Sequence, residues 1–230
     1  MFNIDFNDKT NHDLGIMVTT RPSIPSPVER GEYIDIAGRD GSLLITDGTY
    51  ENITIEVAMN FVRPPHQWMK TFREAKAWIK GGGKLRMSDD IEVFYKVKAC
   101  GISSNDRTAK EGGHIVASFV CDPFSYFESG LIPIQGGGQI NNPFMESHPI
   151  YKITGNGTCT LTVNDNDMVV TVGQNVTIDT DLMLSYREDG ELVNSSVQGE
   201  YRDLWMPSGM NSVSITSGFN LSVIPNWRTL

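Results

Sequence analysis

The chain has 230 residues, 39% of them hydrophobic, and a formal net charge of -9 at pH 7. This hydrophobic content argues against a disordered chain, and the negative charge argues against binding of nucleic acid through a basic patch. The sequence has no run of about 18 or more apolar residues, so no transmembrane helix is expected. Its first segment contains early acidic residues and lacks the basic region of a signal peptide.

The N-terminal part of the sequence predicts strands joined by tight turns. Residues 33–61 fit a strand, a turn over Gly38–Gly41, a short strand, a turn at Asp47–Gly48 and a long strand. Glycine takes a positive φ without steric cost, and Asp-Gly between apolar runs is typical of a hairpin. Residues 53–61 alternate apolar and polar, which predicts one buried face. Residues 21–29 contain three prolines and predict an extended connector.

One helix is predicted after these strands. Pro64 and Pro65 suit a first helical turn, where no amide donor is needed, and Gly81–Gly83 ends the helix. Core packing is favoured over a ligand site for its apolar face, which consists of Trp68, Phe72, Ala75 and Ile79. Strands at residues 85–87 and 91–99 are expected to follow around an Asp89–Asp90 turn.

The second half of the sequence predicts a separate sandwich. The glycine-rich, uncharged segment 135–143 indicates a boundary. Short alternating strands follow it, as is typical of a compact β-sandwich, at residues 150–154, 159–163, 168–172, 175–179, 182–187, 212–216 and 220–224. The expected fold class is mainly β, with an N-terminal sandwich or barrel-like domain that contains one helix and a C-terminal sandwich. The expected boundaries are residues 1–134, a linker over 135–145 and residues 146–230.

No catalytic, cofactor-binding or metal-binding residue is predicted, and no cofactor is expected. The histidines stand singly, without the spacing of a zinc site, at His12, His66, His114 and His148. Asn164–Asp167 offers oxygen ligands for calcium but lacks the glycine and glutamate positions of a calcium loop, which favours a turn. Gly81–Lys84 lacks the flanking residues of a phosphate loop.

Two further sets of residues are candidates for sites. The three cysteines, Cys100, Cys121 and Cys159, are interpreted as free thiols that pack as small hydrophobic side chains. Trp205, beside Tyr201 and Arg202, is the best candidate for an aromatic platform that binds sugar, although the same tryptophan equally suits a core or an interface.

Several segments in the same order resemble the phage distal tail protein family, known as Dit. Ala37 stands where family members often carry proline, and this difference leaves the turn chemistry intact. The matching segments are residues 33–61, 113–119, 121–124, 142–143, 149–157, 178–180, 206–211 and 226–228.

The resemblance implies a structural virion protein of the tail tip and not an enzyme. It implies a homo-hexameric ring between the tail tube, or major tail protein, and the tail-associated tip protein, with receptor-binding or baseplate proteins as further partners. The second domain is implied to be galectin-like. Assembly in the bacterial cytoplasm, no membrane partner, and DNA only as passing cargo are also implied.

The charge distribution is compatible with a DNA conduit. Residues 131–230 contain four basic and ten acidic residues, and acidic walls repel phosphate. Basic residues that would act against this repulsion are Lys80, Lys84, Arg86, Lys96 and Lys98. The alternative function is a host-glycan-binding adhesin module of the tail tip, and a third is an enzyme that cleaves cell-wall polysaccharide.

Overall fold

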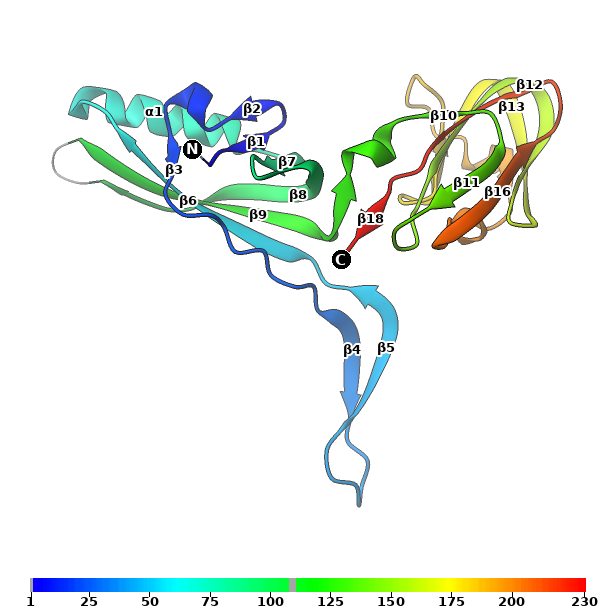
Figure 1. The fold of residues 1–230 in the computed structure, drawn as a ribbon, viewed down its shortest axis with the longest axis horizontal. Coiled ribbons are helices and arrows are strands. Elements are labelled where there is room, and N and C mark those ends of the chain that lie inside the picture. Colours follow the sequence, from blue (N-terminus) through cyan, green and yellow to red (C-terminus); the bar gives the residue numbers. More distant parts are fainter. Residues whose placement is uncertain (1, 108–110) are drawn as a thin grey trace. The chain divides into compact units, whose positions relative to one another are not determined.

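The computed structural model describes residues 2–107 and 111–230 and divides the chain into two compact units, Met1–Ser125 with Leu230, and Tyr126–Thr229. Figure 1 shows both units as mainly β, which confirms the expected fold class. None of the helices in the described ranges is long and apolar enough to cross a membrane.

The first unit contains one α-helix among its strands. Its elements are β1 (Ile4–Phe6), β2 (Lys9–Thr10), the 3-10 turn η1 (His12–Leu14), β3 (Met17–Val18), β4 (Glu29–Ile34), β5 (Leu43–Tyr50), β6 (Ile53–Val62), α1 (Pro65–Trp78), β7 (Gly83–Met87), β8 (Asp90–Arg107) and β9 (Gly112–Phe127).

One sheet of the first unit has the order β2-β1-β7-β8-β9-β6-β3. Strand β6 pairs antiparallel with β9 from Ile53 opposite Cys121 to Val62 opposite Gly112. The expected alternation in β6 is confirmed, because every second side chain from Ile53 to Phe61 is buried and those between are not. These buried side chains form the core together with β1, β7, β9 and α1.

Helix α1 covers this core, as the spacing of its apolar residues predicts. Trp68, Ala75 and Ile79 are buried in the core, and Phe72 is partly buried against it. The Trp68 ring lies 5.4 Å from the Phe61 ring and 5.3 Å from the Phe72 ring, measured between centroids. The core interpretation of this face is therefore confirmed.

Strands β4 and β5 form a separate two-stranded sheet, which we call the hairpin (Figure 1). The turn at its tip joins the Arg39 N–H to the Ile36 carbonyl at 3.1 Å, with Gly38 at φ 81°. The expected turn at Asp47–Gly48 is wrong, because both residues lie inside β5. There they form a bulge opposite Arg30, since a glycine at φ 75° serves a bulge as well as a turn.

The second unit contains strands and 3-10 turns. Its elements are η2 (Glu128–Leu131), β10 (Ile134–Gln135), β11 (Gly138–Asn142), β12 (Ile150–Val163), β13 (Asn166–Asp179), β14 (Leu184–Tyr186), η3 (Asn194–Ser196), β15 (Val197–Gln198), η4 (Tyr201–Leu204), β16 (Gly209–Ile215), β17 (Asn220–Ile224) and β18 (Arg228–Thr229).

Two long strands replace four of the expected short ones. Strand β12 pairs with β13 along its whole length, and it also pairs with β17 through its first five residues and with β16 through its last three residues. Gly155 and Gly157 lie between these partners, and the ring of Phe219 occupies the space beside Gly155. The glycines therefore bend a continuous strand and do not end it.

The division into units differs from the expected boundaries. The segment expected to be a linker contains the last residue of β10 and all of β11, and these strands pair with β17 and β16 inside the second unit. Gly136 and Gly138 have φ values of 76° and 135°, which allow a tight turn between these two strands. The division falls instead between Ser125 and Tyr126, within β9.

Candidate interaction surfaces

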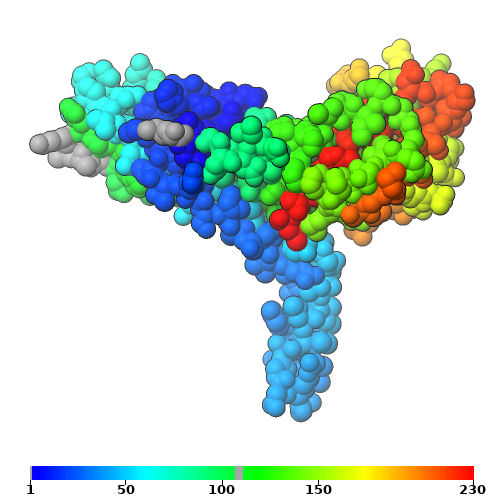
Figure 2. Space-filling view, viewed as in Figure 1, coloured from blue at the N-terminus to red at the C-terminus, as the bar shows by residue number. Residues whose placement is uncertain are grey.

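The hairpin presents an unusual number of exposed large apolar side chains. Tyr33 is 71% exposed and Ile45 is 51% exposed. Ile34, Ile36, Leu43 and Leu44 are also exposed. In Figure 2 the side chains of β4 and β5 form a narrow ribbon, with no other part of the first unit packed on its visible face. A two-stranded ribbon is at best marginally stable in water, and clustered exposed apolar side chains mark interaction sites.

The root and the bulge of the hairpin are held by specific contacts. The Tyr50 ring packs edge-on against the Phe124 ring of β9, with 5.8 Å between centroids. The Asp47 carboxylate accepts hydrogen bonds from the Thr49 hydroxyl at 2.6 Å and from the Thr49 N–H at 2.9 Å. These two bonds hold the pKa of Asp47 below its usual range, so the ionised carboxylate fixes the bulge.

The free side of β6 is bordered by the proline-rich connector between β3 and β4. The Thr19 N–H donates to the Ala58 carbonyl at 2.9 Å, and the Glu51 N–H donates to the Val28 carbonyl at 2.8 Å. The connector is thus fixed to Ala58 of β6 near its start and to Glu51, just before β6, at its end. Between these two bonds lies a groove of about 470 Å³, lined by Ser23, Pro25, Thr54, Glu56, Ala58 and Val116.

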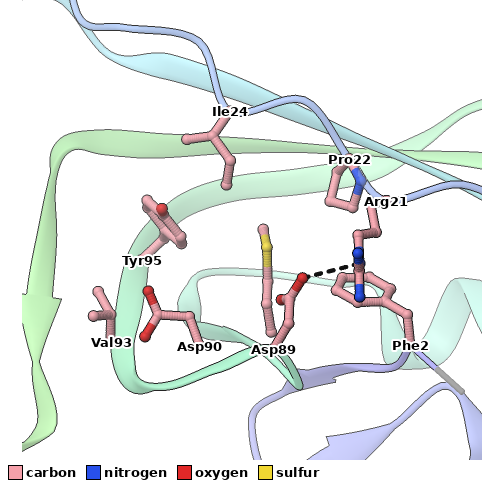
Figure 3. Close-up of a pocket in the computed structure, with 9 residues that line it drawn as sticks. Phe2, Arg21, Pro22, Ile24, Asp89, Asp90, Val93 and Tyr95 are labelled. Carbon is pink, nitrogen blue, oxygen red and sulfur yellow. Dashed lines mark ion pairs between the residues drawn. The ribbon is translucent and has the colours of Figure 1, made fainter.

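A second cavity, of about 360 Å³, lies where the connector begins (Figure 3). Arg21 forms an ion pair with Asp89 at 3.1 Å and lies over the Phe2 ring, 5.7 Å from its centroid. Ile24, Tyr95 and Val93 provide the apolar wall in Figure 3. The ion pair joins the start of the connector to the turn between β7 and β8. The contacts that line this cavity therefore hold the connector in place.

Basic residues of β7 and β8 share the sheet face that is opposite the core. Lys84 stands opposite Lys96, whereas the neighbouring pair Leu85 and Tyr95 points into the core. Acidic residues accompany the cations on this face. Arg86 Nη1 lies 3.4 Å from Asp5 Oδ1 and 3.0 Å from Asp8 Oδ1. Lys98 Nζ lies 2.6 Å from Asp122 Oδ1. The face therefore carries charges of both signs.

In the second unit, the proposed sugar platform is engaged by other side chains. The Trp205 ring stacks on the His148 ring at 4.0 Å, and Arg202 lies over Trp205 at 5.7 Å from its centroid. The Trp205 Nε1–H donates to the Thr180 carbonyl at 3.3 Å. Tyr201 lies apart from this stack, because its hydroxyl bonds to the Ser185 hydroxyl. Structure thus brings Arg202 and Trp205 together but covers the tryptophan face that a sugar would need.

The residues behind Trp205 form a cluster that no sequence pattern indicated. His148 Nδ1 lies 3.0 Å from an Asp181 carboxylate oxygen, and Arg228 Nη2 lies 2.8 Å from His148 Nε2. A neutral imidazole with its proton on Nδ1 satisfies both contacts. Arg228 Nε also donates to the Glu146 carbonyl at 2.7 Å, so the cluster anchors the last strand of the second unit.

The remaining candidate residues have local structural roles. Asn164 and Asp165 have φ values of 48° and 69°, as a two-residue hairpin turn requires, which confirms the turn expected there. Among the described residues, no group of three or more His, Cys, Asp or Glu side chains is placed to hold a metal ion. The other three histidines lie apart; of these, His114 Nδ1 contacts Asn60 Oδ1 at 2.6 Å.

All three cysteines are free thiols, as expected. Cys121 and Cys159 are buried, whereas Cys100 is half-buried and contacts the Gly81 carbonyl at 3.1 Å. Burial, with smaller contributions from Asp122 and Cys100, raises the pKa of Cys121 to about 12. This thiol is therefore protonated at neutral pH and is a poor nucleophile.

Together these elements define a β-rich protein of two units, with one helix on the sheet of the first. The same fold occurs in the crystal structure of SPP1 Dit, described as a paradigm of the hub adsorption apparatus in phages that infect Gram-positive bacteria. The match covers 97% of this chain and 98% of that chain, with a TM-score of 0.71 and 12% sequence identity. No protein-family model matches the sequence, and comparison with curated proteins gives no match. The match confirms that the chain has the overall, mainly β fold of a distal tail protein.

Proposed function

We propose that the protein is the hub of a phage tail tip, where a ring of six copies joins the tail tube to the adhesion device around an opening for DNA. The observation that carries this proposal is the structural match to SPP1 Dit, which leaves almost no part of either chain outside it. A match of this extent includes both units and the hairpin region. A match limited to one domain would be weaker support for the proposed hub function.

The exposed hairpin supports self-assembly. Its apolar side chains gain free energy when they leave water, at roughly 25 cal/mol per Å² of apolar surface buried. A closed ring is built from one repeated contact between two different patches of the same chain. An apolar projection on each copy provides one of these two patches.

The same proposal places the protein in the virion, at the tail tip, after assembly in the bacterial cytoplasm. Its partners would be the tail tube protein, the tail-associated tip protein and receptor-binding or baseplate proteins, with DNA as passing cargo. No catalytic step and no membrane contact are part of this function. The galectin-like description of the second unit belongs to this proposal as well.

Glycan binding has weaker support as an alternative. A sugar-binding platform needs an open aromatic face, and His148 stacks on the Trp205 ring at 4.0 Å. A glycan array tests this alternative directly. Specific binding that a Trp205→Ala variant loses would favour the adhesin.

The ring is tested by light scattering and negative-stain microscopy of the purified chain, alone and with the tube and tip proteins. The expected particle is a ring with about six times the monomer mass of 25.5 kDa. Leu44→Asp in the hairpin should abolish the ring, whereas Val62→Asp, at an exposed position on β6, is the matched control and should retain it. A chain that remains monomeric under all these conditions would overturn the proposal.

A further inference from the structure

Three adjacent strands of the first unit bring together an amine, a carboxamide and a carboxylate. Strand β9 lies between β8 and β6; Lys98 belongs to β8, Asp122 belongs to β9, and Asn52 directly precedes β6. Lys98 Nζ lies 2.6 Å from Asp122 Oδ1 and 2.9 Å from Asn52 Oδ1. Because Ile53 pairs with Cys121, Asn52 and Asp122 are neighbours across the two strands. These side chains contain the groups that an isopeptide bond requires.

Asn52 is held in this place by the contacts of its neighbours in the chain. The Glu51 N–H donates to the Val28 carbonyl at 2.8 Å. The Tyr50 ring packs against the Phe124 ring, with 5.8 Å between centroids. Immediately after Asn52, the pairing of β6 with β9 begins. The carboxamide is therefore presented to the amine by fixed backbone on both sides.

The amine needs only a short movement to reach the carboxamide carbon. A C=O bond is about 1.2 Å long, so Asn52 Cγ lies within about 4.1 Å of Lys98 Nζ. Reacting atoms are about 3–3.5 Å apart in a productive geometry, so a movement of roughly 1 Å is sufficient. The flexible four-carbon stem of lysine permits this movement. Two groups held in this way react with effective molarities of about 10⁵–10⁸ M.

Asp122 is placed to transfer the proton that blocks the reaction. Only an uncharged amine is a nucleophile, and an ordinary lysine is charged at neutral pH. The Asp122 carboxylate lies at hydrogen-bond distance from the ammonium group and can accept one of its protons. The Lys98 side chain is 53% exposed, so its uncharged form is rare and the reaction is slow. A slow reaction is sufficient, because the bond has to form only once in each chain.

We propose that Lys98 and Asn52 join in an isopeptide bond, with Asp122 as the base and acid that moves the proton. A bond forms between Lys98 Nζ and Asn52 Cγ, and the bond between Asn52 Cγ and Nδ2 breaks. One of the three ammonium protons stays on the new amide. The other two leave with the Nδ2 amino group as an ammonium ion, one of them through Asp122. The bond would tie the start of β6 to β8 within a single chain, so this inference does not depend on the proposed ring.

Mass spectrometry of the purified chain tests the proposal. After incubation at pH 9, where more of the amine is uncharged, the wild-type chain should be lighter by the mass of one ammonia molecule. A protease digest should contain a branched peptide that joins Asn52 to Lys98. Lys98→Arg is the matched control, because arginine keeps a cation beside Asp122 and stays protonated. Ammonia lost by cyclisation at another asparagine would persist in Lys98→Arg, so the difference between the two chains measures the isopeptide bond.

A second variant tests the part assigned to Asp122. Asp122→Asn cannot accept the proton, so the branched peptide should form about 100-fold more slowly than in the wild-type chain. Circular dichroism of each variant shows that the fold is retained. Formation at the wild-type rate in Asp122→Asn would overturn the assignment of Asp122. A wild-type chain without the branched peptide after prolonged incubation would overturn the isopeptide bond itself, whether or not Asp122→Asn folds, and would leave Lys98 and Asp122 as an ion pair only.

Discussion

A single methyl group at Gly113 should destabilise the first unit. A Cβ built on Gly113 would lie 2.4 Å from the Phe61 ring and 2.4 Å from the Trp68 indole nitrogen. Ordinary carbon contacts begin at about 3.5 Å, so both rings would have to move by roughly 1 Å. Phe61 and Trp68 are both buried, and overpacking of a close-packed core costs about 1–3 kcal/mol.

Gly101 offers a matched control on the neighbouring strand. A Cβ at Gly101 meets no atom within 4 Å, and neither glycine has a positive φ. Gly101→Ala should therefore be neutral or slightly stabilising, because alanine reduces the entropy of the unfolded chain. The comparison separates steric overlap from the general effect of replacing a glycine in a strand.

Thermal and urea unfolding measure the difference, at a concentration where both variants have the same oligomeric state. For a chain of this length, 1 kcal/mol shifts Tm by about 2–4 °C, so Gly113→Ala should melt at least 2 °C below Gly101→Ala. Equal melting temperatures would show that Phe61 and Trp68 are not packed against Gly113. The account of how α1 covers the sheet would then be wrong.

Three other predictions concern the helix, the hairpin bulge and the thiols. Phe72→Ala should cost about 2 kcal/mol in urea unfolding, less than a fully buried phenylalanine, because Phe72 is only partly buried. The lowered pKa of Asp47 means that its ionised form stabilises the bulge above the ordinary carboxyl pKa. This contribution is lost as pH falls through the lowered pKa, so Thr49 amide exchange, corrected for intrinsic rates, should lose protection there and not in Asp47→Asn. In the native protein a thiol reagent at pH 8 should modify at most Cys100, because Cys121 and Cys159 are buried; rapid reaction of all three would contradict this.

Patterns of neighbouring residues were sufficient to predict some helices and strands of this protein from the sequence. Helix α1 begins at Pro65, and glycines follow close after its end, since proline suits a first turn and Gly81 takes a positive φ. The alternation in β6 specified which of its faces is buried, because side chains alternate across any strand. The apolar run Leu43–Ile45 is visible in the sequence too, although nothing there indicates that these residues stay exposed.

Tertiary structure decided where similar local signals lead to different outcomes. Asp47–Gly48 was expected to turn the chain but forms a bulge, because pairing with β4 continues on both sides of it. Separate strands were expected at residues 150–154 and 159–163, yet β13 pairs across Gly155 and Gly157 and Phe219 fills the space beside Gly155. In each case a positive φ is the local requirement, and a distant strand or side chain determines whether the strand continues.

Contacts between residues far apart in the chain could not be predicted from the sequence, because they too depend on distant strands and side chains. His148, Asp181 and Arg228 meet only because the fold brings the segment before β12, the turn after β13 and strand β18 together, and no spacing along the chain encodes that meeting. The groove beside β6 likewise depends on where the prolines of residues 22–27 lie relative to a strand that begins at Ile53. Sequence determined which segments form strands and which faces are apolar, because these depend on neighbouring residues. Tertiary structure alone decided which edges and side chains remain unpartnered, because that depends on every other strand of the fold.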